Sequence, residues 1–549
     1  MVESYLERAA EKRSHQLQLI PSEWRLKDIP SFESVPDALD YIRTSGVLSS
    51  EELAITETSD ITSLLQKLAQ GELSSLQVVK AFAKRAAIAQ QLTNCCTELF
   101  FEEAFDDARK LDDSLSKTGK TAGPLHGLPV SVKDCFKVKG QDTTVGWVGL
   151  IDKPAEEDAY AVAALRKLGA VIYLKTNVPQ SMMMSDSFNH VFGQTVNTLN
   201  RNLISGGSSG GESSLIAARA SPLGLGTDIG GSIRIPAALC GLYGLSPTLS
   251  RQPHNRGGPR QNIVLPVAGP MATSLASIEA YMQALQHAKP WEIDPRGAPL
   301  PWRAEECTIA PSRRLKVGYV VDDGVVKPQP PVARAVGQVV AALKAAGHEV
   351  VEWDATSHAH GYELFEKAIL SDGGAACRRL CEMSGEPLIE GMLVGTSANL
   401  LTTDETHELL GQKFDYEAKY LHRWHAAGLD ALIMPVTPWV GYKPWTWVKS
   451  HQYVGYTSMF NLLNWPSLVI PVTRVSKELD EPVPQDWVDH HGRNPSDEFN
   501  KQQYDFNLVE GMPVGVQILC GKHEDEKCIA VGKVIESLLG QGLDKKEGL

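Results

Sequence analysis

The chain has 549 residues, of which 43% are hydrophobic and 22% are charged, a composition typical of a globular protein with a sizeable core. Acidic residues outnumber basic ones by 66 to 53, which argues against a nucleic-acid substrate because neutralising phosphates requires clustered Lys and Arg. The nine cysteines are too sparse for a disulfide scaffold and indicate reduced thiols in the cytosol.

The hydropathy of the chain bears on its location. Residues 1–16 carry charges throughout and lack the apolar stretch of a signal peptide. No run reaches about 18 apolar residues, so we expect no transmembrane helix and no stable membrane insertion. These features predict a cytoplasmic location.

The first predicted elements are helices. Residues 1–75 are polar and form a predicted N-terminal helical region, with one helix beginning near Ser50 and another over 61–70. Residues 74–90 continue with apolar side chains at helical spacing.

Beyond this region, short apolar strands alternate with helices. A strand over 125–132, a helix over 155–168 and a strand over 170–174 form one β-α-β unit, which implies a parallel pair. Similar units follow, with strands at 223–226, 241–244, 316–321, 349–352, 431–435 and 467–471 and helices at 211–219, 332–346, 405–427 and from Arg234.

This alternation predicts an α/β fold. We expect residues 76–549 to form a single large domain, in which a mixed, mainly parallel β-sheet is covered by helices on both faces. The polar stretch over about 477–506 predicts a surface insertion before a last strand at 513–519.

Two glycine-rich segments stand out against this background. Residues 206–211 read GGSSGG, which on its own is more typical of a linker, but an apolar helix follows at once, so the glycines are expected to be packed. Residues 226–236 read GTDIGGSIRIP and lie between a strand and a helix. Such a turn points several backbone N–H groups into one space, as an oxyanion hole requires, and Ser232 lies at its end. The segment does not match the G-x-G-x-x-G motif of dinucleotide-binding folds. With Gly224 and Gly226 as the first two glycines, the third position is Ile229.

A lysine ends the strand in the third segment, HGLPVSVKD, residues 126–134. Burial at such a position disfavours the ammonium form and lowers the pKa of Lys133, which makes a neutral amine available as a base. The commoner alternative is a surface lysine at a strand end.

Together the three segments resemble the amidase signature family, over about residues 50–475 and the last strand. The spacing also fits, with 75 residues from Lys133 to Ser208 and 24 from Ser208 to Ser232. The chain is most similar to two branches, the fungal acetamidases and the fatty acid amide hydrolases. The former share IPSEW at 20–24, and the latter share the stretch from PQSM to FGQT, residues 179–195.

The resemblance implies a roughly 470-residue catalytic domain that hydrolyses amides through a Ser-cisSer-Lys triad and an acyl-enzyme, without metal or cofactor. Ser232 would be the nucleophile, Ser208 would follow a cis peptide bond and relay the proton, and Lys133 would be the base. The remaining roles fall on the same segments: oxyanion N–H groups at Ile229, Gly230, Gly231 and Ser232, a positioning role for Ser209, and a loop brace of Thr227, Asp228 and Arg234.

The sequence is less compatible with other functions. Gly206–Gly210 also fits a G-x-S-x-G elbow with Ser208 as nucleophile, but 197–205 does not read as the strand that an elbow needs. The three histidine pairs lack a third metal ligand at a telling spacing. An amidotransferase catalytic subunit is disfavoured by the fungal-type N-terminus, and a non-catalytic binding protein by the intact triad.

The substrate is a small-molecule amide. In the resembled family the segment containing Met182, Met183 and Met184 lines the acyl pocket, and methionine offers an adaptable apolar wall, although core packing explains these residues nearly as well. Four aromatic residues after Pro438 could line an entrance or form a homodimer contact: Trp439, Tyr442, Trp445 and Trp447. Both features favour an apolar aryl or fatty acyl group larger than acetyl, with a short-chain acetamidase as the alternative.

Overall fold

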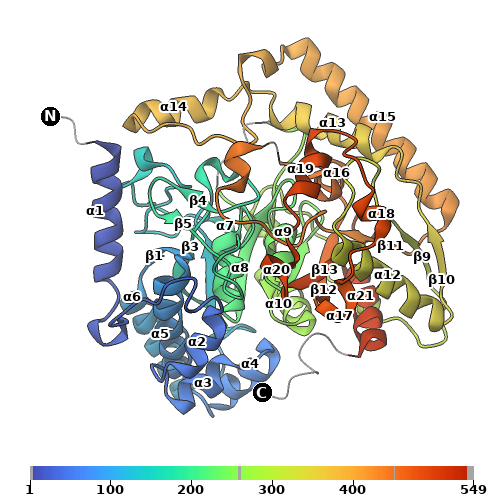
Figure 1. Ribbon diagram of the computed structural model, residues 1–549. Coiled ribbons are helices and arrows are strands. Elements are labelled where there is room, and N and C mark those ends of the chain that lie inside the picture. Colours follow the sequence, from blue (N-terminus) through green and yellow to red (C-terminus); the bar gives the residue numbers. More distant parts are fainter. Residues whose placement is uncertain (1–3, 257–260, 451, 541–549) are drawn as a thin grey trace.

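The computed structural model describes residues 4–256, 261–450 and 452–540 (Figure 1). An 11-stranded sheet runs through it in the order β1-β3-β2-β6-β8-β7-β12-β13-β11-β9-β10, and β4 and β5 form a separate pair. The strands are β1 (Cys96–Leu99), β2 (Pro129–Lys133), β3 (Val171–Thr176), β4 (Phe188–Asn189), β5 (Gly193–Gln194), β6 (Leu223–Asp228), β7 (Tyr243–Ser246), β8 (Val267–Ala272), β9 (Lys316–Tyr319), β10 (Glu349–Glu352), β11 (Ala431–Pro435), β12 (Ser467–Arg474) and β13 (Pro513–Leu519).

Helices surround this sheet. They are α1 (Tyr5–Gln18), α2 (Ala38–Thr44), α3 (Ser50–Thr56), α4 (Ile61–Gln70), α5 (Ser75–Thr93), α6 (Phe101–Thr118), α7 (Tyr160–Lys167), α8 (Gly210–Ala217), α9 (Arg234–Leu239), α10 (Leu275–Ala288), α11 (Pro290–Ile293), α12 (Pro330–Ala345), α13 (His358–Ile369), α14 (Ala375–Ser384), α15 (Thr403–Ala427), α16 (Gly455–Leu463), α17 (Lys477–Asp480), α18 (Gln485–Val488), α19 (Pro495–Gln502), α20 (Phe506–Val509) and α21 (Asp525–Leu539).

The sheet is mixed, as predicted. β3, β2 and β6 are parallel to one another, and so are β11, β9 and β10. In both runs helices separate the successive strands, which is what a parallel crossover requires. Between the runs β8, β7, β12 and β13 pair antiparallel, so the parallel character predicted from the β-α-β pattern is confined to these two runs.

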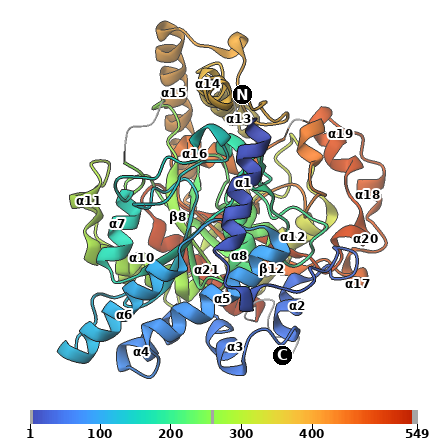
Figure 2. The same cartoon turned by 90° about the vertical axis from the view of Figure 1, so that its left-hand side faces the viewer.

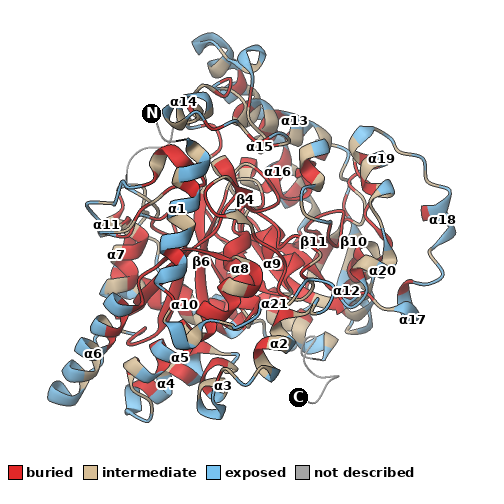
Figure 3. Cartoon of the chain, turned by 60° about the vertical axis from the view of Figure 1, so that its left-hand side comes forward, coloured by how far each residue is buried: buried red, intermediate tan, exposed pale blue. Residues whose placement is uncertain are grey.

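Helices cover both faces of the sheet, as predicted. The evidence is that successive side chains of β6 point to opposite faces and contact different helices. A side chain at Gly224 or Gly226 would run into α8 and the residues around it, whereas Leu223 and Leu225 join the core cluster that contains Ile278 of α10. Because successive strand residues point to opposite faces, α8 and α10 lie on opposite sides of β6. Figure 3 shows α8, α9 and the strands between the layers as the most deeply buried part of the chain.

Two strands of the sheet were not predicted. β1 reads CTEL and has no alternation of apolar and polar residues, and β8 reads VAGPMA, with a glycine and a proline that usually weaken a strand signal. The strand predicted at 241–244 begins two residues later, as β7.

Among the N-terminal helices, α4 shares the main core. Ile61, Leu64 and Leu68 of α4 belong to the same apolar cluster as Ile278 of α10. The segment over 477–506 carries the short helices α17, α18 and α19 at one side of the molecule (Figure 2).

Candidate active site

Lys133 ends β2 and is fully buried. Its Nζ lies 2.7 Å from Ser208 Oγ and 2.8 Å from Thr227 Oγ1. Burial disfavours the ammonium form and lowers the pKa of Lys133 to about 8, although the negative charges that Cys135, Asp228 and Glu212 can carry act in the opposite direction. A base that is partly neutral near pH 8 is therefore in contact with a serine hydroxyl.

Ser208 lies in the turn that leads into α8. The Gly207–Ser208 peptide bond is cis, as the resemblance implied. A side chain at Gly207 would meet the carbonyl oxygens of Met184 and Asp186, so only glycine fits where this turn crosses the 184–186 segment. The residues before it form an isolated bridge between Val196 and Ile204 and no strand, which removes the support that a nucleophile elbow needs.

Ser209 connects this turn to the one that carries Ser232. Its backbone N–H donates to the carbonyl oxygen of Ser232 at 3.2 Å, and its Oγ lies 3.4 Å from the carbonyl oxygen of Thr227. The Ser232 backbone is therefore held next to the Ser208 turn. Ser232 itself is only partly buried, unlike Lys133 and Ser208, so it is the member of the three that a substrate can reach.

Asp228 and Arg234 brace the Ser232 turn from within. Arg234 donates to Asp228 from Nε at 3.0 Å and from a terminal nitrogen at 2.9 Å, and both side chains are buried. Burial alone would raise the pKa of Asp228, but the Arg234 guanidinium and the hydrogen bond from Asn461 lower it to about 2. The pair therefore stays ionised and fixes the turn.

Three residues from distant segments also hydrogen-bond to the Asp228–Arg234 pair or to the Ser232 turn. No local sequence pattern predicted them. Asn461 donates to Asp228 Oδ1 at 2.8 Å, and Gln517 accepts from Arg234 at 3.1 Å. Thr457 Oγ1 donates to the carbonyl oxygen of Gly230 at 2.6 Å, which fixes the orientation of the next peptide group.

The backbone N–H groups of this turn differ in what they contact. The Gly231 N–H donates to Asp228 Oδ1 at 2.8 Å, so it contacts the brace instead of the cavity, contrary to its predicted place among the oxyanion donors. No acceptor in the described part of the chain is found for the N–H groups of Ile229, Gly230 and Ser232. These three are therefore the groups available to a ligand.

A cavity of about 30 Å³ opens beside Ser232. Its wall combines the predicted methionines with residues far away in sequence: Met182, Met183, Met184, Ser185, Gly207, Ile229, Gly230, Ser232, Ile235, Phe365, Leu393, Gln452 and Val454. Gln452 holds the methionine segment, because its side chain accepts from Ser185 N at 2.7 Å and donates to the carbonyl oxygen of Met183 at 3.0 Å. The wall is apolar apart from the serine turn and the polar side chains of Ser185 and Gln452.

The aromatic residues after Pro438 do not line this cavity. Trp439, Tyr442 and Trp447 are buried and pack on one another, with ring centroids 4.9 to 5.4 Å apart, so the prediction of an entrance or a dimer contact is wrong for them. Only Trp445 of this group is exposed, and its ring packs on Phe188.

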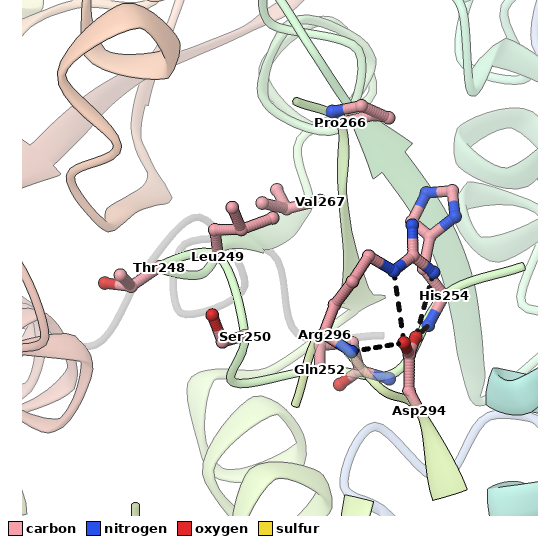
Figure 4. Close-up of a pocket in the computed structure, with 9 residues that line it drawn as sticks. All are labelled: Thr248, Leu249, Ser250, Gln252, His254, Pro266, Val267, Asp294 and Arg296. Carbon is pink, nitrogen blue, oxygen red and sulfur yellow. Dashed lines mark hydrogen bonds and ion pairs between the residues drawn. The ribbon is translucent and has the colours of Figure 1, made fainter. Parts of the chain in front are cut away.

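A smaller cavity of about 10 Å³ lies near the start of β8 (Figure 4). Asp294 accepts from Arg296 and from the backbone N–H of His254 at its edge. Burial lowers the pKa of His254 to about 3, so its ring is neutral. The space suits one water molecule, so the larger cavity beside Ser232 is the stronger candidate.

The described residues contain no cluster of three or more His, Cys, Asp or Glu side chains placed to hold a metal ion. Two of the three histidine pairs in the sequence, His358/His360 and His490/His491, have a member in another contact: His358 is buried against Tyr420, and His490 lies 2.9 Å from Asp497. Over the same described ranges, no helix is both long and apolar enough to cross a membrane.

Comparison with known proteins identifies the family to which this chain belongs. The Amidase family matches residues 77–529, and the chain belongs to that family. The acetamidase of Emericella nidulans is 38% identical over 555 residues, covering 98% of this chain and 99% of that protein. The acetamidase of Aspergillus oryzae is 37% identical, with the same two coverages.

A solved structure of a fatty acid amide hydrolase superposes with a TM-score of 0.90 at 34% identity, covering 97% of this chain and 95% of that one. A bacterial aryl acylamidase at 19% identity and a TM-score of 0.69 shares the fold. The family predicted from the three sequence segments is thereby confirmed.

Proposed function

We propose that this amidase acts through Lys133, Ser208 and Ser232 on small-molecule amides with a short apolar acyl group. The observation that carries the proposal is the 2.7 Å contact between the buried Lys133 Nζ and Ser208 Oγ, one residue after Gly207, which lines the same cavity as Ser232. A neutral lysine in that position can accept a proton through Ser208 from a hydroxyl beside it, and we infer that Ser232 supplies that hydroxyl because its carbonyl oxygen accepts from the N–H of Ser209, the next residue after Ser208.

The reaction runs in two halves. As Ser232 Oγ attacks the amide carbonyl carbon, its proton passes to Ser208, whose own proton passes to Lys133 Nζ. The carbonyl oxygen becomes an oxyanion and is stabilised by the N–H groups of Ile229, Gly230 and Ser232. The proton then returns through Ser208 to the leaving nitrogen, so that ammonia or an amine departs and Ser232 is acylated. Water hydrolyses the acyl-enzyme by the same relay.

The size of the cavity limits the acyl group. A space of about 30 Å³ holds two or three groups of the size of a water molecule, since one water needs roughly 10–15 Å³. A space of this size favours an acetyl or propionyl group, because a larger acyl group would contact the methionine side chains in the wall. Among the predicted substrates, the short-chain alternative is therefore favoured. The acetamidases named above are consistent with this preference.

A stand-alone enzyme is favoured over an amidotransferase subunit because the chain matches those acetamidases over 98% of its length. The cytoplasmic location and the homodimer stay predictions.

The test measures ammonia release from acetamide, propionamide, benzamide and a long-chain fatty amide. Ser232→Ala, Ser208→Ala and Lys133→Ala should each abolish activity, while Ser116→Ala on the exposed surface of α6 should retain it. Activity that survives Ser232→Ala would refute the nucleophile assignment. A preference for the fatty amide over propionamide would refute the short acyl group and leave the mechanism standing.

A further inference from the structure

Glu212 is a buried carboxyl group that the proposed mechanism does not use. It lies in the first turn of α8, four residues after Ser208, and is fully buried. Within the described residues its hydrogen-bond partners are two hydroxyls, Ser131 Oγ at 2.6 Å and Thr176 Oγ1 at 2.9 Å. A side chain at Gly224 would overlap the Glu212 carboxyl, so the glycine of β6 leaves room for it.

The position of these partners connects Glu212 to Lys133. Ser131 precedes Lys133 by two residues on β2, and so the two side chains share a face of the sheet. Thr176 is the register partner of Lys133 on β3. Glu212 therefore fastens the start of α8, and with it the Ser208 turn, to both strands around the lysine.

The hydroxyl contacts beyond Ser131 indicate the protonation state of Glu212. Ser131 Oγ also lies 2.9 Å from Ser221 Oγ, which lies 2.8 Å from the carbonyl oxygen of Leu223. The chain of contacts contains three oxygen pairs: Glu212 with Ser131, Ser131 with Ser221, and Ser221 with Leu223. Each pair needs one hydrogen between its oxygens, but the two serine hydroxyls supply only two. A protonated Glu212 supplies the third, whereas an ionised one leaves an oxygen pair in close contact without a hydrogen.

The surroundings of Glu212 agree with a neutral acid. Burial raises the pKa of Glu212 to about 8, and the hydroxyls of Ser131 and Thr176 and the charge of Lys133 lower it only in part. The other titratable groups that face it are Cys96 of β1 and Tyr173 of β3, and burial raises the pKa of both, so neither supplies a charge. An ionised Glu212 would favour the ammonium form of Lys133 and lower the fraction of it that is neutral.

We infer that Glu212 is a carboxylic acid in the folded enzyme and acts as a positioning residue: it donates to Ser131, accepts from Thr176, and holds the Ser208 turn over Lys133 without placing a negative charge beside the lysine. The consequence for Lys133 rests on the proposed function. The protonated state itself does not.

The first experiment is an infrared difference spectrum of wild type minus Glu212→Gln at pH 7, without substrate. A carboxylic-acid C=O band present in wild type and absent in the variant supports the inference, and the symmetric and antisymmetric bands of a carboxylate in its place would overturn it. Thr176→Val keeps Glu212 and removes one hydrogen bond to it, so the same acid band should shift in frequency. This variant gives the answer even where Glu212→Gln does not fold.

Activity supplies the second readout. The amide of Glu212→Gln can donate to Ser131 and accept from Thr176, so we expect kcat/KM within about threefold of wild type and an unmoved acid limb of its pH profile. A limb that moves to lower pH would show that wild-type Glu212 carries a charge. Glu103→Gln, which removes an exposed carboxylate from α6, is the matched control.

Stability gives a readout that does not need activity. A raised carboxyl pKa means that the folded protein holds the proton more tightly than the unfolded chain, so this contribution is full below the unfolded pKa and is lost as the pH rises through about 8. The Tm of wild type should therefore fall more steeply between pH 5 and 8 than that of Glu212→Gln, and parallel curves over this range would contradict the inference. If no amide is hydrolysed by wild type, the spectra and Tm curves still decide the state of Glu212.

Discussion

The pH dependence of activity tests the role of Lys133 most directly. Its pKa lies at about 8 instead of the model-compound value of 10.5, because burial disfavours the ammonium form. At pH 7 about 9% of such lysines are neutral, about 300 times the neutral fraction of a lysine that titrates at 10.5. We therefore expect kcat/KM to rise about tenfold per pH unit up to pH 8 and to level off above it.

The perturbation that tests this reasoning is Lys133→Ala, followed by ammonia release from propionamide between pH 6 and pH 10. Removing a general base costs about 10²–10⁴-fold in rate, and the loss should be accompanied by the disappearance of the wild-type limb. Lys139→Ala removes an exposed lysine six residues later and should leave both the rate and the pH limb unchanged. A wild-type midpoint above pH 10, or an identical limb in Lys133→Ala, would refute the assignment of the base.

Three further substitutions test the supporting structure. Asp228→Asn leaves the Arg234 charge buried without its partner and should lower the free energy of unfolding in urea by about 3–5 kcal/mol, whereas Asp354→Asn, in an exposed pair with Arg423, should cost under about 1 kcal/mol; equal losses would contradict the brace. Gly207→Ala places a methyl group against backbone carbonyls and should abolish activity, while Gly337→Ala, with open space around it in α12, should retain activity; an active Gly207→Ala enzyme would show that the turn can move. Met183→Ala enlarges the cavity and should raise the preference for hexanamide over propionamide about tenfold, and Met383→Ala on the surface should not; an unchanged ratio would remove Met183 from the acyl wall.

The sequence was sufficient for those parts of the site that lie in continuous segments. The strand ending at Lys133, the glycine-rich turn before α8 and the turn before α9 are each local, and their order along the chain brings their ends to one edge of the sheet. The parallel strands around Lys133 were predictable for the same reason, since β2 and β3 are joined by a single helix. Hydrophobic periodicity and turn chemistry act over about ten residues, and these features need no longer range.

What the sequence left open depends on contacts between distant segments. β8 pairs with β6 and β7 across the chain, and its glycine and proline hide it from a search for apolar alternation. The direction of the Gly231 N–H is likewise set by the carboxylate of Asp228, which a sequence pattern cannot orient. A brace from Thr457, Asn461 and Gln517 reaches the same turn from more than two hundred residues away.

Glu212 shows how a site residue can be conspicuous in sequence and still escape a search for chemistry. It is an ionisable residue in a helix otherwise made of Gly, Ser, Ala, Leu and Ile, and a charged residue in such surroundings is rarely buried without a partner. The sequence shows the anomaly, but the number of hydrogens shared among Glu212, Ser131 and Ser221 can be counted only once the three oxygens have positions. That count makes the carboxyl neutral, so Glu212 adds no negative charge that would favour the ammonium form of Lys133.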